Sequence, residues 1–225
     1  MKGEKSMNME PIQRKIAQDL LKIRAVFVRP KEPFTWASGI KSPVYCDNRL
    51  TLTDVQVRRD VEEAIAEVIR NEYPEAEILM GTSTAGIPHA ANSAHLLNLP
   101  MGYVRSGAKD HGRQNQIEGR LMPGQKVVVV EDLISTGGSV LEVVEILRDA
   151  GAFVLGIVSI FTYGMQKGID RLAEANVKNI SLTNFDVIAE EAAKEGYIQP
   201  ADIRRLISFR NNPSDTGWME EENEK

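Results

Sequence analysis

Two adjacent carboxylates, Glu131 and Asp132, follow a run of four valines in the stretch VVVVEDLISTGGS, residues 127–139. The valines predict a buried strand, and ligands of open parallel sheets bind beyond the carboxyl ends of such strands. Backbone N–H groups at a helix N-terminus can bind a phosphate dianion, and neighbouring carboxylates can accept hydrogen bonds from sugar hydroxyls. A sugar phosphate would therefore suit the small residues that lead into the next predicted helix, which are Ser135, Thr136, Gly137, Gly138 and Ser139.

A simpler interpretation of the same stretch stays open. Ser135 or Thr136 could cap the helix, with the two acids as surface residues at its start. Two common nucleotide sites are excluded, because the sequence contains no G-x-x-x-x-G-K-[ST] and no G-x-G-x-x-G that follows a strand.

The elements that must position these residues alternate between strands and helices. Hydrophobic runs and periodicity predict strands at 76–80, 100–105, 126–130 and 152–161. Helices are expected over 12–27, after a cap at Thr53 or Asp54, through 90–97, from the Gly137–Gly138 turn to about Ala150, and twice within 184–210. This alternation predicts an α/β fold, in which helices flank a twisted parallel sheet.

One stretch differs from this pattern. Residues 34–52, FTWASGIKSPVYCDNRLTL, form short β-rich pieces interrupted by Ser-Gly and Ser-Pro, which predicts a small hairpin-like element outside the main core. We therefore divide the chain into 1–50, the first helix with this element, 51–210, the α/β core with C-terminal helices, and 211–225, a polar acidic tail expected to fray.

Composition limits the classes of function. The net charge of −5 argues against a general nucleic-acid binder, because phosphate backbones favour a basic face. Cys46 is the only cysteine, which rules out an intramolecular disulfide. No apolar run approaches the roughly 20 residues of a membrane span, and the charged N-terminus is not a secretory signal. We expect a soluble cytoplasmic protein without a membrane partner.

Residues 127–139 resemble, over their full length, the thirteen-residue phosphoribosyl-pyrophosphate (PRPP) motif of type I phosphoribosyltransferases. The resemblance implies the type I phosphoribosyltransferase fold. It also implies that Glu131 and Asp132 hold the ribose hydroxyls and that the residues from Ser135 to Ser139 bind the 5′-phosphate. Leu133 and Ile134, which join the two parts, complete the implied PRPP site.

Two further stretches, 34–49 and 103–119, resemble orotate phosphoribosyltransferases. In that family the first stretch covers the base, and we name residues 34–52 the hood. The resemblance implies transfer of phosphoribosyl from PRPP to orotate, which gives orotidine 5′-phosphate and pyrophosphate in pyrimidine synthesis. Mg²⁺ is the implied cofactor, held mainly by PRPP and water rather than by side chains. The candidates for contacting orotate are Ser135, Lys41, Tyr45 and Cys46.

The segment 105–119 is rich in cations and glycines, with Arg105, Lys109, His111 and Arg113. A solvated surface loop with incidental charge is one interpretation. The other is a mobile loop whose cations stabilise a leaving pyrophosphate. The resemblance implies the second, with Arg105, Lys109 and His111 as catalytic and PRPP-binding residues, and with the loop reaching into the neighbouring site of a homodimer.

A second candidate for anion binding is the stretch 81–86, GTSTAG, between a predicted strand and a predicted helix. A plain strand-to-helix turn is the alternative. In the resembled family this loop binds pyrophosphate, which would involve Thr82, Ser83, Thr84, Ala85 and Gly86. On the helix that follows, we interpret His89 and His95 as packing or surface residues rather than ligands.

The chain departs from the family pattern at several cations. Ala37 and Ala85 stand where some members carry lysines, and Lys109 is the only lysine of the 105–119 loop. The sequence FTYG, residues 161–164, replaces a region that holds an orotate-binding arginine in some members. Lys41 and Arg49 are nearby cations outside the motif positions.

Two other functions stay open. A related enzyme could use a purine or uracil, against which the hood sequence argues. A non-enzymatic regulator could bind PRPP as an effector, but such regulators usually carry a nucleic-acid domain or a basic face, and neither is visible here.

Overall fold

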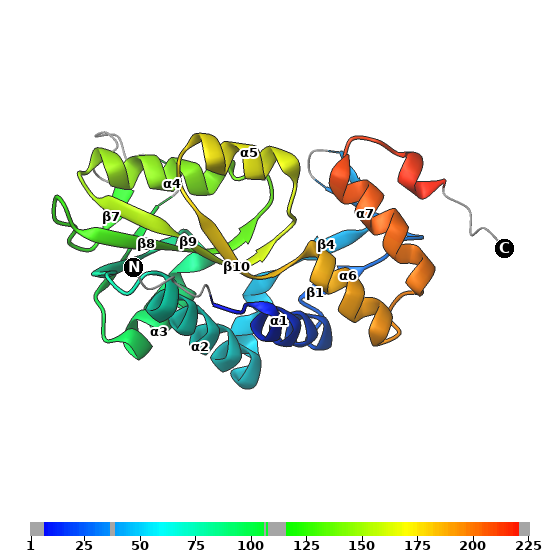
Figure 1. Cartoon of the computed structure of the whole chain (residues 1–225), viewed down its shortest axis with the longest axis horizontal. Helices are drawn as coiled ribbons and strands as arrows, with labels where there is room; N and C mark the ends of the chain where they lie inside the picture. Colours follow the sequence, from blue (N-terminus) through cyan, green and yellow to red (C-terminus); the bar gives the residue numbers. More distant parts are fainter. Residues whose placement is uncertain (1–6, 37–38, 106, 108–115, 221–225) are drawn as a thin grey trace, which may run out of the picture.

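A central six-stranded sheet lies between two layers of helices in the computed structural model, which describes residues 7–36, 39–105, 107 and 116–220 (Figure 1). All neighbouring strands in it are parallel except β6 and β7, which are antiparallel. The prediction of a twisted parallel sheet flanked by helices is confirmed. In spatial order the strands are β10 (Asn179–Asn184), β9 (Phe153–Thr162), β8 (Lys126–Ile134), β5 (Ile78–Thr82), β6 (Met101–Val104) and β7 (Ile117–Glu118).

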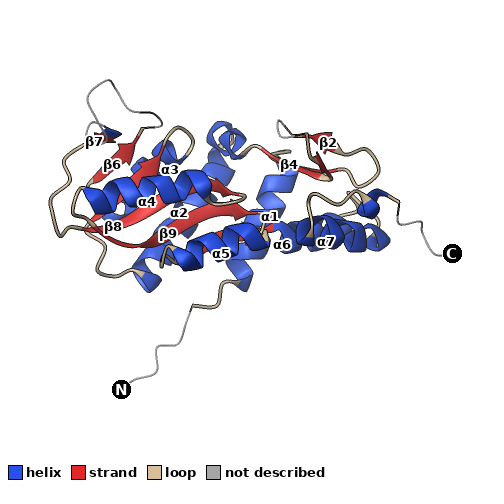
Figure 2. Cartoon of the chain, turned by 90° about the horizontal axis from the view of Figure 1, so that it is seen from above, coloured by secondary structure: helices blue, strands red, loops and turns tan. Residues whose placement is uncertain are grey.

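The helices divide between the two faces of this sheet (Figures 1 and 2). One face is covered by α4 (Gly138–Asp149) and α5 (Gln166–Glu174). The other is covered by α1 (Glu10–Lys22), α2 (Val55–Glu72) and α3 (Gly86–Leu97). The Asp54 carboxylate caps α2 by accepting hydrogen bonds from the N–H groups of Gln56 and Val57, at 3.0 Å each, which confirms the second of the two expected caps.

The hood and the C-terminal helices gather at one end of the molecule (Figure 2). The short strands pair in two antiparallel sheets outside the core, as expected, and Trp36 of the hood packs edge-on against Tyr163 and Phe209. The elements of this end are β1 (Val26–Val28), β2 (Phe34–Thr35), β3 (Lys41–Ser42), β4 (Val44–Cys46) and the 3₁₀ turn η1 (Asn48–Thr53), with α6 (Phe185–Lys194), η3 (Pro200–Asp202), α7 (Ile203–Asn211) and η4 (Gly217–Met219).

The first helix is shorter than its periodicity predicts. It ends at Lys22 rather than near Phe27, and Arg24 takes a left-handed conformation with φ of 58°. Val26–Val28 then pairs with Val44–Cys46 as a two-stranded sheet. β-branched valines favour strand pairing over the last turn of a helix. This preference explains why the predicted helix extended beyond the observed end of α1.

Strand β8 is longer than predicted. The expected end was Val130, but pairing with β9 continues through Glu131 and Leu133 to Ile134. The acids therefore belong to the last part of a paired strand, which fixes their backbone positions in the sheet.

The prediction that the C-terminal tail frays is wrong for its described part, residues 211–220. Trp218 is 1% exposed and packs edge-on against Phe209, with ring centroids 5.6 Å apart. Because the residues around Trp218 are mostly polar, no sequence pattern predicts its burial. Among the described residues, no helix has the length and apolar character that crossing a lipid bilayer requires.

Candidate active site

The two acids of β8 differ in environment. Glu131 is 5% exposed, and its Oε1 accepts hydrogen bonds from Thr82 Oγ1 at 2.7 Å and from the N–H of Asp132 at 2.9 Å. Burial, followed by hydrogen bonding with the Asp132 carboxyl, raises the pKa of Glu131 to about 8, although the Thr82 hydroxyl opposes this shift. Glu131 can therefore hold a proton near neutral pH while Asp132 stays half-exposed beside it.

The second anion-binding candidate meets the same edge of the sheet. Strand β5 runs parallel to β8 with Gly81 opposite Val130, so Thr82 ends its strand beside Glu131. A Cβ on Gly86 would lie 2.5 Å from both Thr82 Oγ1 and Val130 O, which means that only glycine lets α3 begin this close to the two strands. The loop of residues 83–85 is thereby held next to the acids.

The start of α4 lies at the same end of the sheet. Its N-cap is Gly137, with a φ of 74°, and no side chain caps the helix. The simpler interpretation, in which Ser135 or Thr136 caps this helix, is therefore wrong. The N–H groups of the first turn remain available to an anion, with the helix dipole behind them.

These elements surround one cavity of about 450 Å³, which we call the first cavity. It brings the predicted pyrophosphate loop together with both acids and the end of the PRPP motif. The predicted residues that line it are Thr82, Ser83, Thr84, Ala85, Arg105, Glu131, Asp132, Leu133, Ser139 and Cys46. Asp47, Arg49 and Glu142 are lining residues that sequence reasoning did not assign to the site.

The cationic segment 105–119 contributes Arg105 to this wall. Its Nε lies 2.9 Å from Glu118 Oε1, in an ion pair between β6 and β7 ends. Lys109 and His111, the other two predicted catalytic residues, lie outside the described residues.

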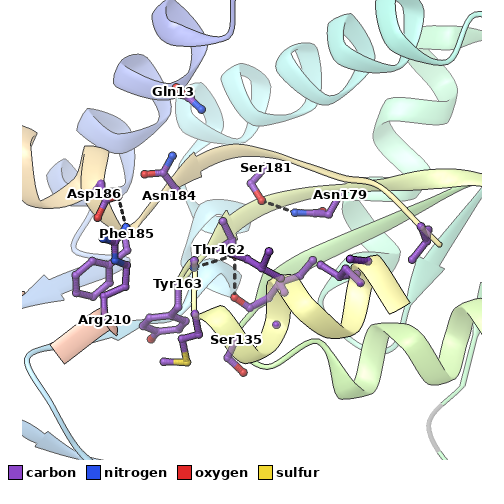
Figure 3. Close-up of a pocket in the computed structure, with 18 residues that line it drawn as sticks. Gln13, Ser135, Thr162, Tyr163, Asn179, Ser181, Asn184, Phe185, Asp186 and Arg210 are labelled. Carbon is purple, nitrogen blue, oxygen red and sulfur yellow. Dashed lines mark hydrogen bonds and ion pairs between the residues drawn. The ribbon is translucent and has the colours of Figure 1, made fainter. Parts of the chain in front are cut away.

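A second cavity of about 500 Å³ lies beside the ends of β9 and β10, next to α5 (Figure 3). Ser135 and Ile134 line it together with Tyr163, whereas Leu133 faces the first cavity. Asp186 and Arg210 form an ion pair at 2.5 Å on its wall. The structure therefore divides the predicted PRPP motif between two neighbouring cavities, and Thr136, Gly137 and Gly138 line neither of them.

The three hood candidates for orotate also separate. Cys46 lines the first cavity, where burial, with Asp132 and Asp47 adding to it, raises the pKa of its thiol well above the usual value. Lys41 donates from Nζ to Thr35 Oγ1 at 2.7 Å, and Tyr45 packs on Phe34 in a separate shallow pocket. The inward position of Cys46 follows the alternation of β4, on which neighbouring residues face opposite sides.

A buried residue that links the hood to strand β8, Asn48, was not identified from the sequence. Asn48 is 1% exposed, accepts a hydrogen bond from Cys46 Sγ at 3.2 Å, and donates from Nδ2 to the backbone oxygen of Asp132 at 2.7 Å. The polar triplet DNR, residues 47–49, directly after a hood strand was the available signal.

The histidines of α3 agree with their predicted packing and surface roles. His89 is fully buried, 3.4 Å from Thr51 Oγ1, and burial lowers its pKa to about 4, so it is uncharged at neutral pH. His95 is exposed on the last turn. The described residues contain no cluster of three or more His, Cys, Asp or Glu side chains that could hold a metal ion.

Comparisons with known proteins agree with this geometry. Residues 51–195 match the phosphoribosyl transferase domain family. The chain is 55% identical to the orotate phosphoribosyltransferase of Listeria innocua over 90% of its own length and 97% of the relative. Identity to the Bacillus subtilis orotate phosphoribosyltransferase is also 55%, over 91% and 94% of the two chains. The crystal structure of the Aeropyrum pernix orotate phosphoribosyltransferase superposes with a TM-score of 0.71 at 32% identity, covering 81% of this chain and 99% of that one. The chain belongs to the orotate phosphoribosyltransferase family.

Proposed function

We propose that this protein transfers the phosphoribosyl group of PRPP to N1 of orotate, with Mg²⁺ as cofactor, in the synthesis of pyrimidine nucleotides. In this reaction the bond between C1 of the ribose and the pyrophosphate oxygen breaks, a bond between C1 and N1 of orotate forms, and the N1 proton leaves to the pyrophosphate or to water. The observation that carries the proposal is the first cavity, where Glu131 and Asp132 meet the loop from Thr82 to Ala85 and Ser139 at the start of α4.

The proposed sugar phosphate would lie in this cavity in one direction. The 5′-phosphate would bind the N-terminus of α4, where Ser139 lines the wall and no side chain occupies the cap. Ribose hydroxyls would donate to Glu131 and Asp132. Because the diphosphate leaves from the opposite end of the ribose, it would lie at the Thr82 loop, which approaches Glu131 from β5.

Orotate would bind where the hood meets the end of the PRPP motif. Cys46 lines the first cavity, and Ser135 lies at the neighbouring cavity with Tyr163. This arrangement would hold the base in line with the departing diphosphate, so that binding and orientation supply much of the catalysis.

The residues present fit a hard cation that reaches the site with its substrate. Mg²⁺ commonly keeps waters and phosphate oxygens as its ligands, and the half-exposed Asp132 at the cavity wall could accept hydrogen bonds from waters of an ion held mainly by PRPP. When bound, Mg²⁺ would neutralise charge on the leaving diphosphate. Glu131 and Asp132 would position the ribose, and the residues that line the cavity would exclude competing water.

We also infer a homodimer, in which the segment 105–119 acts at the partner subunit's site. The support for this is the likeness to the family. Mixing a Lys109→Ala variant with a Glu131→Gln variant tests the inference. Each variant alone should be nearly inactive, and subunit exchange should restore partial activity only if the loop works in trans.

The direct test of function follows the ultraviolet absorbance of orotate in the presence of purified protein, PRPP and Mg²⁺. We expect absorbance to fall only when all three are added, and EDTA to stop the change. Uracil and hypoxanthine, assayed for pyrophosphate release, serve as control bases. Release with one of those bases instead would overturn the assignment of orotate, and tight PRPP binding without any transfer would indicate a regulator.

A further inference from the structure

Arg49 is a cation of the first cavity that lies outside the PRPP motif, the loop 81–86 and the segment 105–119. It lies in the hood, on the 3₁₀ turn η1, and lines the cavity together with the loop from Thr82 to Ala85. A guanidinium in this place is suited to phosphate oxygens, because its N–H groups form a fixed fork that matches them.

The orientation of this guanidinium is set by a neighbour. Asp47 caps η1. Arg49 donates two hydrogen bonds to its carboxylate, from Nε to Oδ1 at 2.6 Å and from Nη2 to Oδ2 at 2.8 Å. This side-on pair leaves the Nη1 group of Arg49 with no hydrogen-bond partner among the described residues. The arginine also lowers the pKa of Asp47, chiefly through the side-chain hydrogen bond, which keeps the carboxylate ionised as a support.

The charges of the cavity call for such a cation. Ala85 stands in the anion-binding loop, which therefore supplies hydroxyl and backbone groups but no positive side chain. Of the described lining residues, four are acids and two are arginines, namely Asp47, Glu131, Asp132, Glu142, Arg49 and Arg105. Arg105 is already engaged with Glu118 at 2.9 Å. Among the described lining residues, Arg49 is therefore the cation whose fork of N–H groups lies on the hood side of the cavity and could meet a diphosphate there.

The ion pair with Asp47 does not oppose this use. The Arg49 side chain is 67% exposed, and an ion pair exposed to solvent in this way contributes little to stability. Arg49 can therefore turn toward an incoming anion at low cost, or keep Asp47 on Nε and Nη2 while Nη1 reaches the substrate.

We propose that Arg49 binds the diphosphate of PRPP and stabilises the charge that develops on the leaving pyrophosphate, a role that rests on the proposed phosphoribosyl transfer. As the C1–O bond breaks, its electron pair stays on the pyrophosphate oxygen. N1 of orotate supplies the pair for the new bond, and its proton leaves to the pyrophosphate or to water. Arg49 would thus contact the diphosphate from the hood side of the cavity, whereas a lysine at position 85 would contact it from the side of the 81–86 loop.

The test compares Arg49→Ala and Arg49→Lys with the wild type, by pyrophosphate titration calorimetry and by steady-state kinetics. A lost hydrogen bond between charged groups predicts that Arg49→Ala weakens pyrophosphate binding and lowers kcat/KM for PRPP by on the order of 10- to 100-fold. We expect little change in the KM for orotate. Arg49→Lys should recover only part of the loss, because an ammonium cannot bind two oxygens side by side.

Two controls separate the possible causes. Arg204→Ala removes another exposed cation, from α7, and should match the wild type. Asp47→Asn keeps Arg49 but weakens its support, so it should give a smaller loss than Arg49→Ala. Because Arg49 is exposed, the thermal midpoint of Arg49→Ala should stay close to that of the wild type.

The outcomes also separate this role from the proposed function. If the wild type transfers phosphoribosyl to orotate and Arg49→Ala equals it in kinetics and pyrophosphate binding, the role of Arg49 is wrong and the function stands. If the wild type shows no transfer, the proposed function fails, and pyrophosphate titration of the two proteins still decides whether Arg49 binds this anion.

Discussion

Asn48 holds the backbone oxygen of Asp132 with its Nδ2 at 2.7 Å, across 84 positions of sequence. The backbone oxygen of Asn48 in turn accepts from Thr51 Oγ1 at 2.6 Å, so η1 is itself braced. Through this one carboxamide the hood is tied to the strand that carries both acids.

The first prediction concerns this tie. Asn48→Ala should lower the free energy of unfolding by about 1–3 kcal/mol, because it removes a buried carboxamide and the hydrogen bond that it donates to the part-buried carbonyl of Asp132. It should raise the KM for PRPP more than the KM for orotate, since Asp132 loses its fixed position. Asn71→Ala, which removes an exposed carboxamide on α2, is the matched control. Equal effects on both substrates would show that Asn48 only stabilises the fold.

The second prediction concerns the pH dependence of stability. The pKa of Glu131 rises from 4.5 to about 8 on folding, so the folded state binds its proton more tightly than the unfolded state. The resulting stabilisation is complete below pH 4.5 and is lost as pH rises through 8. Thermal melts of wild type and Glu131→Gln between pH 5 and 9 should therefore show the wild type losing stability relative to the variant. A pH-independent difference would contradict the raised pKa.

The third prediction concerns the close approach at Gly86. In Gly86→Ala, the new methyl would lie 2.5 Å from Thr82 Oγ1 and Val130 O, so α3 must shift away from β5 and β8. We expect a loss of about 1–3 kcal/mol in unfolding free energy and a higher KM for PRPP. The control is Gly217→Ala, where a Cβ meets only the end of the Asp215 side chain at 3.3 Å. Wild-type kinetics in Gly86→Ala would show that the loop tolerates displacement.

The fourth prediction concerns the tail. Trp218→Ala should cost about 3–5 kcal/mol in denaturant unfolding, because it empties a buried site beside Phe209. Tyr197→Ala, which truncates an aromatic that is largely exposed, should change stability little. Similar midpoints for Trp218→Ala and the wild type would mean that the tail adds nothing to the fold.

The sheet could be predicted from sequence because each core strand is a short apolar run. Val127, Val128, Val129 and Val130 are fully buried, and runs of this kind belong to parallel strands covered on both faces. The end of β8 could not be predicted, because pairing of Glu131 with Ser159 depends on a partner strand far along the chain. For the same reason, Trp218 was hidden among polar residues until Phe209 gave it a partner.

The site was predictable as far as motifs reach. Glu131 and Asp132 were expected to hold ribose hydroxyls and the loop that begins at Thr82 to bind an anion, and these residues meet at one cavity. The contributions of Asn48 and Arg49 depend on where the hood folds back onto β8, which no local pattern encodes.

The aromatic contacts between the hood and the C-terminal helices allow intrinsic tryptophan fluorescence to report movement of the hood. The chain contains two tryptophans, and both pack edge-on against Phe209, Trp36 at 5.8 Å and Trp218 at 5.6 Å. Any movement of the hood away from α7 would alter the surroundings of Trp36 and leave those of Trp218 in place. Intrinsic fluorescence of a Trp218→Phe protein would thus follow the hood alone while substrates bind, without an attached dye.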